Sequence, residues 1–407
     1  MDEAKSDYVD IAKLGRGGMR EVYLSVERAR PVRAGLVVLK RVDSWLTEEP
    51  EFIETYAVEA ERSLRLDHPG VVRTKKVGRD AEGHFVATEY VDGQSLLAVL
   101  RSAAAKEGLP LAMHVRVLAD ALEPLHYAHE IEVLHRDATA RNVFVDYEGR
   151  VRLADFCIGR SNESRQTAAD VLRTQKIPYM SPEEARGDAI DRQSDLFAFG
   201  VMLWKAATGQ RLWRGLTGMQ TLYRLHSGDI PSPRTVNPTV PERLEAICMR
   251  ALAHDRAQRY ATAAEMRADL DAWLLETGEN VQARDVGRFV TALFAEARTK
   301  NDRVIDQQLA ALGAGSPLVV KDLRLDAGET VESTPENTDD SRFWTTASLK
   351  SPAKIAKSSA SDDPPKAAAP ASTQTKVAAD EPKTPAWMVY AVVALVIAVA
   401  MTMLLRR

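Results

Sequence analysis

The 407-residue sequence has only two cysteines, Cys157 and Cys248, which excludes a framework of disulfide bonds and favours a reducing compartment. Its net charge of −4 is small, and it has no long basic run, which argues against nucleic acid as a partner. The first ten residues, MDEAKSDYVD, are acidic and polar, so we expect no cleavable signal peptide there.

The composition is that of a globular protein, with 45% hydrophobic and 28% charged residues. A chain of this length is too long for one ordinary core and indicates segments of different character. We expect one continuous domain over 8–274 and a helical extension over 275–314. Residues 315–385 are rich in Pro, Ala, Ser, Thr and Lys, and this composition predicts a disordered linker.

One long hydrophobic run, AWMVYAVVALVIAVAMTMLL, occupies residues 386–405 without a charge. A helix of this length spans the roughly 30 Å hydrocarbon layer of a bilayer. The alternative is a buried core helix, but a uniformly apolar segment that follows a polar linker has no visible partner to bury it. We therefore predict a single transmembrane helix here.

The first candidate for chemistry is the segment LGRGGMREVYL, residues 14–24. Gly15 and Gly17 allow backbone amides to approach phosphate oxygens closely. An alternating strand pattern follows, and the β-branched run LVVLK ends at Lys40. Glycine clusters are more often plain turns, so this segment alone is weak support for a phosphate site.

The role of Lys40 depends on whether a buried carboxylate lies within its reach, and the helix predicted around Glu59 could supply one. Phe52 and Ala60 belong to a set of positions that recur at spacings of three and four, which marks one helix face. Glu59 lies on that face, whereas Glu61 points to the opposite side. A carboxylate that faces inward needs a cation, and Lys40 is the candidate.

Two further segments carry acidic and amide side chains. The octapeptide HRDATARN covers residues 135–142 and includes Asp137 and Asn142, and the apolar strand in VRLADFC leads to Asp155. Oxygen ligands of this kind suit magnesium, and a carboxylate suits a base for a hydroxyl nucleophile.

The ordered series of glycine loop, Lys40, Glu59, HRDATARN, DFC, YMSPEE and SDLFAFG resembles a bacterial eukaryotic-like (Hanks-type) serine/threonine protein kinase. The resemblance covers about 8–274. It implies an α+β, two-lobed fold, with five strands and one helix in the N-lobe, a larger helical C-lobe, and ATP bound between them with Mg²⁺.

The resemblance also assigns roles to single positions. It implies that Lys40 binds the α- and β-phosphates of ATP and is held in place by Glu59. It also implies that the backbone groups of Glu89 and Val91, which follow Thr88, form hydrogen bonds with adenine. The lid over ATP would be formed by Leu14, Gly15, Gly17 and Val22.

In the catalytic loop, the resemblance makes Asp137 the group that orients the substrate hydroxyl and accepts its proton. It makes Asn142 and Asp155 ligands of Mg²⁺, and Asp195 the buried acid that supports the loop from below.

Glu183 and Arg259 correspond to the ion pair that fastens the activation segment to the C-lobe. That segment argues for a protein kinase against a small-molecule kinase, which would require that Glu183 and Arg259 not meet.

Four positions depart from the pattern. Arg20 replaces the third glycine of the loop and Cys157 replaces the glycine after DF, and each reduces backbone freedom. Thr139 stands where a lysine is usual, and Lys176 stands where a threonine is usual. We interpret these two as an exchange, in which Lys176 supplies the cation beside the catalytic acid and is hydrogen-bonded by Thr139. Arg141 is a rival source of that cation.

We therefore predict an ATP-dependent enzyme that phosphorylates serine and threonine of protein substrates, in a membrane-tethered, single-pass form with a cytoplasmic kinase domain. Arg136 suggests that a phosphate on the activation segment binds it, because arginine before the catalytic acid often pairs with such a group. The candidate acceptors are Ser161, Ser164, Thr167 and Thr174. A signal would arrive through a membrane partner or a homodimer. The alternative is a pseudokinase scaffold, suggested by Arg20, Cys157 and Thr139.

Overall fold

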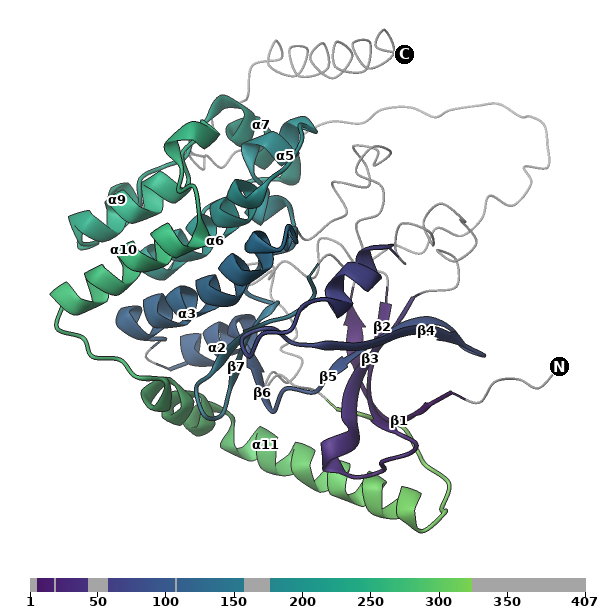
Figure 1. Ribbon diagram of the computed structural model, residues 1–407. Coiled ribbons are helices and arrows are strands. Elements are labelled where there is room, and N and C mark those ends of the chain that lie inside the picture. Colours follow the sequence, from purple (N-terminus) through teal and green to yellow (C-terminus); the bar gives the residue numbers. More distant parts are fainter. Residues whose placement is uncertain (1–5, 18–19, 43–57, 107, 157–175, 324–407) are drawn as a thin grey trace, which may run out of the picture. The chain divides into compact units, whose positions relative to one another are not determined.

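The computed structural model describes residues 6–17, 20–42, 58–106, 108–156 and 176–323 (Figure 1). Most of the predicted linker, the candidate phosphorylation sites and the hydrophobic run over 386–405 lie outside these ranges. None of the helices within the described ranges is both long and apolar enough to cross a bilayer.

The N-terminal part of the described chain forms a twisted sheet with the strand order β4-β5-β3-β2-β1-β9. Its neighbours are antiparallel, except that β9 runs parallel to β1. The strands are β1 (Tyr8–Gly17), β2 (Arg20–Glu27), β3 (Leu36–Val42), β4 (Thr74–Asp80), β5 (Gly83–Glu89) and β9 (Lys321–Asp322). A 3-10 turn, η1 (Arg33–Gly35), precedes β3, and residues 58–64 are helical.

The register of this sheet aligns residues of the predicted nucleotide site. Gly15 of β1 pairs with Val22 of β2, and Val22 pairs with Lys40 of β3. Lys40 in turn pairs with Val86 of β5. Residues directly opposite each other in a sheet project from the same face, so the glycine loop and Lys40 belong to one row across the sheet.

The sheet has one strand more than the five that the family resemblance implied. The additional strand, β9, comes from the far end of the described chain and covers β1, which would otherwise be an edge strand. An edge strand leaves a row of backbone groups unpaired, and covering it with another strand satisfies them.

The C-terminal part is mainly helical, and a small sheet with the order β6-β7-β8 lies beside it. Its strands are β6 (Gly93–Ser95), β7 (Val143–Asp146) and β8 (Val151–Leu153). Its helices are α2 (Leu96–Ala104), α3 (Leu111–Glu130), α5 (Pro182–Arg186), α6 (Arg192–Thr208), α7 (Gly218–Ser227), α8 (Pro233–Val236), α9 (Glu242–Ala251), α10 (Ala263–Glu276) and α11 (Ala283–Gly313), with 3-10 turns η3 (Ile177–Tyr179) and η4 (Arg256–Gln258).

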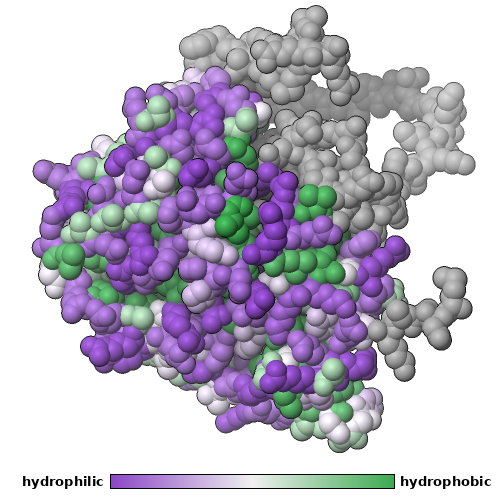
Figure 2. Space-filling view, viewed as in Figure 1, coloured by the Kyte–Doolittle hydropathy of each residue, from purple (hydrophilic) through white to green (hydrophobic). Residues whose placement is uncertain are grey.

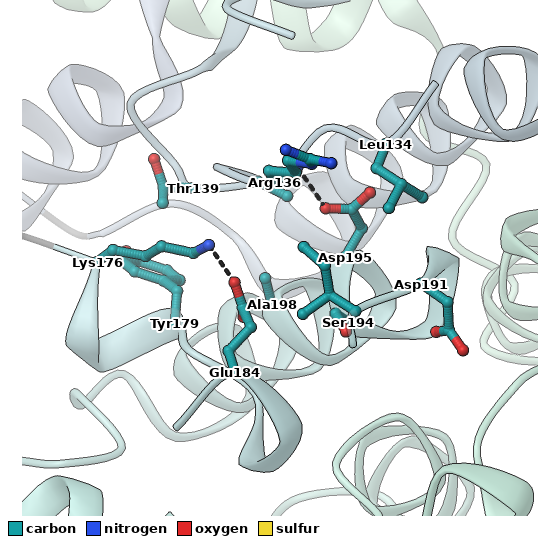
Figure 3. Close-up of a pocket in the computed structure, with 12 residues that line it drawn as sticks. Leu134, Arg136, Thr139, Lys176, Tyr179, Glu184, Asp191, Ser194, Asp195 and Ala198 are labelled. Carbon is teal, nitrogen blue, oxygen red and sulfur yellow. Dashed lines mark hydrogen bonds and ion pairs between the residues drawn. The ribbon is translucent and has the colours of Figure 1, made fainter. Parts of the chain in front are cut away.

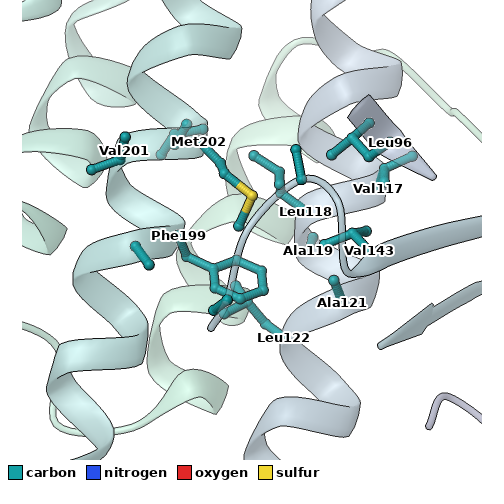
Figure 4. Close-up of a cluster of buried hydrophobic side chains, with 14 of the residues drawn as sticks. Leu96, Val117, Leu118, Ala119, Ala121, Leu122, Val143, Phe199, Val201 and Met202 are labelled. Carbon is teal, nitrogen blue, oxygen red and sulfur yellow. The ribbon is translucent and has the colours of Figure 1, made fainter. Parts of the chain in front are cut away.

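The core of this helical lobe forms where α3 and α6 face each other (Figure 4). Helix α6 is apolar on nearly all sides, and Phe197, Phe199 and Trp204 are almost completely buried. A helix of this kind is expected at the centre of a domain rather than on its surface. The indole nitrogen of Trp204 donates to the carbonyl of Pro231 at 2.9 Å, which satisfies the one polar atom of that side chain.

The described surface in Figure 2 is mostly hydrophilic, and hydrophobic residues appear there in several separate patches. Large exposed apolar side chains such as Tyr223 and Leu275 belong to different helices. Scattered apolar residues of this kind are normal on a folded domain.

Candidate active site

The catalytic loop is held by one buried carboxylate, that of Asp195. The backbone amides of His135 and Arg136 each donate to it at 2.8 Å, and Nε2 of His129 lies 2.8 Å from it. Arg136 has a φ of 62°, a conformation that non-glycine residues adopt rarely and that needs support from its surroundings. The hydrogen bonds from the backbone amides of His135 and Arg136 to Asp195 supply that support.

Local sequence explains why Asp195 is in place. Asp191 caps α6 by accepting from the amide of Gln193 at 2.8 Å, so Asp195 falls in the first turn, where the helix dipole favours a negative charge. Burial opposes ionisation of Asp195, yet the hydrogen bond and charge of His129, with the charge and amide of His135, hold its pKa below the ordinary value. The carboxylate is therefore ionised at neutral pH.

Asp137 and Asn142, the predicted base and metal ligand, contact each other directly. Nδ2 of Asn142 donates to the carbonyl of Asp137 at 2.8 Å and to its Oδ2 at 3.0 Å. The nitrogen of the amide group is thus engaged by Asp137, and Oδ1 of Asn142 is the atom that can act as an acceptor or metal ligand.

Lys40 and Asp155 form an ion pair across the site, between β3 and the segment after β8. Asp155 has a φ of 65°, so its backbone also adopts the left-handed conformation. The pair brings the predicted phosphate clamp and a predicted metal ligand into contact, although 115 residues separate them in sequence.

Glu59 is buried at 3% exposure while Glu61 is exposed, as the helical pattern predicted. Its partner, however, differs from the one predicted. Among the described residues, Glu59 accepts from Nη1 of Arg136 at 2.8 Å, and Lys40 is paired with Asp155 rather than with Glu59. A buried carboxylate requires a cation, and among the described residues the catalytic loop supplies one through Arg136.

The remaining nucleotide-site positions lie around the same sheet. Thr88 is buried, and Glu89 ends β5 with its side chain bound to Arg152 at 2.6 Å. Val91 follows in the segment that leads to the helical lobe. Leu14 packs against the apolar cluster of the N-lobe, directly before Gly15. The backbone contacts expected between this segment and adenine stay a prediction.

Lys176 is buried, and its ammonium forms an ion pair with Glu184 (Figure 3). Glu184 belongs to α5, the helix that follows the activation segment. The predicted hydrogen bond from Thr139 to Lys176 is not among the contacts of the described residues, and the Thr139 hydroxyl points away from the ammonium in Figure 3. The two residues nevertheless line one cavity of about 10 Å³, enough for about one water molecule. In this structure the buried ammonium pairs with Glu184, and its contact with Thr139 beside Asp137 in the active conformation stays a prediction. Arg141 is exposed.

Glu184 is the site residue that motif reasoning missed. Ser181 caps α5 and forms a capping box with Glu184, whose carboxylate accepts from the Ser181 amide at 3.0 Å. A serine followed three residues later by glutamate is a recognised signature of a helix start, so the sequence SPEE contained the signal. That box fixes the carboxylate where Lys176 meets it.

Glu183 and Arg259 form the two-pronged ion pair that the resemblance implied, with nitrogen to oxygen distances of 2.7 and 2.8 Å. Both side chains are fully buried, and Ser194 adds a hydrogen bond of 2.7 Å to Glu183. Burial alone would raise the pKa of Glu183, but the hydrogen bonds from Arg259 and its positive charge lower that pKa to about 2. A small-molecule kinase was expected to lack this contact.

The donor set suits Mg²⁺ bound together with phosphates. Magnesium is commonly held by one or two protein oxygens, and phosphate oxygens and water complete its octahedral shell. Asn142 and Asp155 provide such oxygens, and Asp155 contacts Lys40, a cation for phosphate. Within the described ranges there is no cluster of three or more His, Cys, Asp or Glu that could hold a metal ion.

These features together define a protein kinase fold. They are a sheet with a glycine loop, a helical lobe whose buried carboxylate supports the catalytic loop, and a buried ion pair that fastens the end of the activation segment. The model of the protein tyrosine and serine/threonine kinase family matches residues 9–270. The chain belongs to this family.

Similar proteins include the tyrosine-protein kinase MasK of Myxococcus xanthus, 35% identical over 309 residues, or 73% of this chain and 48% of MasK. The serine/threonine-protein kinase PknB of Mycobacterium leprae is 34% identical over 63% of this chain and 41% of PknB. The chain thus spans about half or less of these curated relatives. The crystal structure of the PknI kinase domain of Mycobacterium tuberculosis is similar with a TM-score of 0.52 at 26% identity, over 67% of this chain and 96% of that one.

We expect Glu183→Gln to lower the free energy of unfolding at pH 7 by about 3–5 kcal/mol, because Arg259 is left buried without its counter-charge. The pKa of Glu183 is lowered from 4.5 to about 2, so its contribution is complete above pH 4.5 and is lost as the pH falls towards 2. Chemical denaturation should therefore show that the difference in free energy of unfolding between wild type and Glu183→Gln becomes smaller as the pH falls through that interval.

The matched control is Asp229→Asn, because Asp229 forms an ion pair with Arg224 in which both side chains are exposed. It should change the free energy of unfolding by less than about 1 kcal/mol. Equal losses in the two variants at pH 7 would contradict the role assigned to the buried pair.

Proposed function

We propose that this chain is an ATP-dependent protein kinase that transfers the γ-phosphate of ATP to serine and threonine hydroxyls of proteins. The observation that carries the proposal is the contact of Asn142 with Asp137, together with the pair of Lys40 and Asp155. These four groups are the ones that phosphoryl transfer needs for a base, a metal and a phosphate.

The geometry suggests how the residues would act. Asn142 engages Oδ2 of Asp137, so Oδ1 is the oxygen that would accept the proton of the substrate hydroxyl. That hydroxyl oxygen bonds to the γ-phosphorus as the bond from phosphorus to the ADP oxygen breaks. Lys40 would orient the phosphates, and magnesium, held by Asn142 and Asp155, would neutralise the charge on their oxygens.

The preference for serine and threonine over tyrosine is the finer part of this proposal. PknB is named a serine/threonine-protein kinase and MasK a tyrosine-protein kinase, both at similar identity to this chain. The family resemblance of the motifs favours serine and threonine. Phosphoamino-acid analysis of the products would distinguish the two.

The pseudokinase alternative finds no support among the described residues. Lys40, Glu59, Asp137, Asn142 and Asp155 are all present, and each of them contacts another of the group or a residue of the catalytic loop. The departures Arg20 and Cys157 lie in segments whose side chains fall outside the description.

We expect Asp137→Asn in the full-length chain to reduce phosphate transfer from ATP by at least about 100-fold, because the amide accepts no proton. Wild type should in addition acquire phosphate on residues 157–175, where Ser161, Ser164, Thr167 and Thr174 lie, and the variant should not. Radiolabel transfer and phosphopeptide mapping measure the two effects.

The exposed residue Asp67, changed to Asn, serves as the matched control and should retain full activity. Equal transfer by wild type and Asp137→Asn would refute the enzymatic proposal. Phosphate found only outside 157–175 would refute autophosphorylation of the activation segment while leaving the enzyme intact.

The cation beside Asp137 is proposed to be Lys176, after it leaves Glu184, with Arg141 as the rival. Support comes from the small cavity that Lys176 lines together with Thr139 of the catalytic loop. A positive charge at the transferring phosphoryl group stabilises the transition state.

We expect kcat to fall about 100-fold in Lys176→Ala and little in Arg141→Ala. Because Lys176→Ala removes the ammonium that pairs with the buried carboxylate of Glu184, a second variant, Lys176→Met with Glu184→Gln, removes both charges together. Steady-state kinetics should show the same loss of kcat in this double variant. Recovery of activity there would mean that Lys176 acts only in holding the fold, and loss in Arg141→Ala alone would assign the cation to Arg141.

We further propose that residues 386–405 anchor the chain in the cell membrane as a single pass, with the kinase domain on the cytoplasmic side, where ATP is found. Support comes from the length and apolar character of the run. Lys383 lies before it and Arg406 and Arg407 after it, so charge bias does not by itself set the orientation.

Leu395→Arg with Ile397→Arg should release the full-length chain from carbonate-washed membranes, because each charge near the centre of the bilayer disfavours insertion by about 3 kcal/mol. The control replaces two exposed apolar residues elsewhere, Leu275 and Val319, by Arg and should stay with the membranes. Equal recovery of all three proteins in the soluble fraction would argue against the anchor.

A further inference from the structure

Helix α11 begins in backbone contact with the helical lobe. A Cβ atom added at Gly287 would lie 2.6 Å from the carbonyl carbon of Glu148, and one added at Gly149 would lie 1.7 Å from the carbonyl oxygen of Ala283. No side chain fits at either position without a shift of the backbone. The first turns of α11 are therefore seated closely against the turn between β7 and β8.

Near its middle, α11 bends and contacts the connection between the lobes. Phe294 is fully buried and has non-helical angles, φ −118° and ψ 15°, which mark the kink. One turn later, Arg298 binds Asp92 at 2.6 Å and lies over the ring of Tyr147 at 4.1 Å. Asp92 lies between β5 and β6, in the segment that joins the sheet to the helical lobe.

Beyond the kink, α11 packs against the N-terminal sheet. Ile305, at 2% exposure, joins an apolar cluster that includes Ile11 of β1 and Leu24 of β2. Arg33, before β3, binds Asp302 and Asp306 of the helix, each at 2.8 Å. Both halves of the same helix are thus attached, one to each lobe (Figure 1).

After α11 the chain turns back and adds β9 to the sheet. The amide of Leu323 donates to the carbonyl of Lys13 at 2.8 Å, and the side chain of Leu323, at 3% exposure, enters the same apolar cluster as Ile305. Gln308 fastens the returning segment by donating to the carbonyl of Val319 at 2.6 Å. Lys13 directly precedes Leu14 and the glycine loop.

We propose that residues 283–323, here called the brace, fix the glycine loop relative to the catalytic loop, with Ile305 and Leu323 as positioning residues for the nucleotide. The proposal rests on the proposed kinase function. The brace gives the sheet a further connection to the helical lobe, besides the segment that contains Asp92 and the ion pair of Lys40 with Asp155. If the loop is correctly placed for only a fraction of the time, the apparent affinity for ATP falls by that fraction.

The test uses the full-length chain with one variant at each end of the brace. Leu323→Asp places a charge in the apolar cluster of the sheet, and Gly287→Ala forces the other end away from the turn at Glu148. Val319→Asp is the control, because it is the same kind of change in the same segment at a side chain that is 70% exposed. The measurements are KM for ATP, kcat, calorimetric binding of MgADP, and hydrogen exchange of residues 8–17.

Both brace variants should raise KM for ATP and weaken binding of MgADP by about fivefold or more, while kcat changes by less than about twofold. Exchange of residues 8–17 should increase in both, whereas exchange of α6 should stay as in wild type, which shows that the helical lobe remains folded. Val319→Asp should match wild type in every measurement.

Unchanged KM, MgADP binding and exchange in Leu323→Asp would overturn the proposal. An effect of Leu323→Asp without one of Gly287→Ala would also overturn it, because the contact would then be local rather than a link between lobes. If the wild type transfers no phosphate, the proposed function fails, but MgADP binding and exchange of residues 8–17 still decide the role of the brace.

Discussion

The buried carboxylate of Asp195 is the constraint on which the site depends. It accepts from two consecutive backbone amides, those of His135 and Arg136, and contacts His129 of α3. These bonds hold Arg136 in a left-handed conformation and so determine the direction in which the next residue, Asp137, leaves the loop. A catalytic residue on a loop needs such support from a rigid helix, because its own backbone offers several conformations of similar energy.

Features that follow from a helix or strand period, or from a motif, were predictable from sequence. The strand over EVYLSV, the inward face of Glu59 and the pair of Glu183 with Arg259 follow from periodicity or from motifs, and the structure confirms them. The partners of Lys40 and Lys176 were not predictable in this way. Sequence does not reveal which carboxylate the packing brings to each buried cation.

Three ion pairs share one property, namely that a cation of the site is neutralised by a carboxylate of the chain itself. Lys40 pairs with Asp155, Arg136 with Glu59, and Lys176 with Glu184. A buried charge that leaves one partner must find another, since an isolated charge at low dielectric is strongly disfavoured. Any movement of Glu59 towards Lys40 would take from Arg136 the carboxylate that it binds here, so the changes at these two pairs are coupled.

The strand β9 also has a practical consequence for handling the protein. The family match ends at residue 270, yet the sheet is completed only at β9. A fragment cut between these points would expose the edge of β1 together with Ile11 and Leu24, which α11 and Leu323 otherwise cover. Uncovered strand edges beside apolar surface promote association between chains. The unit to express and crystallise therefore extends through residue 323.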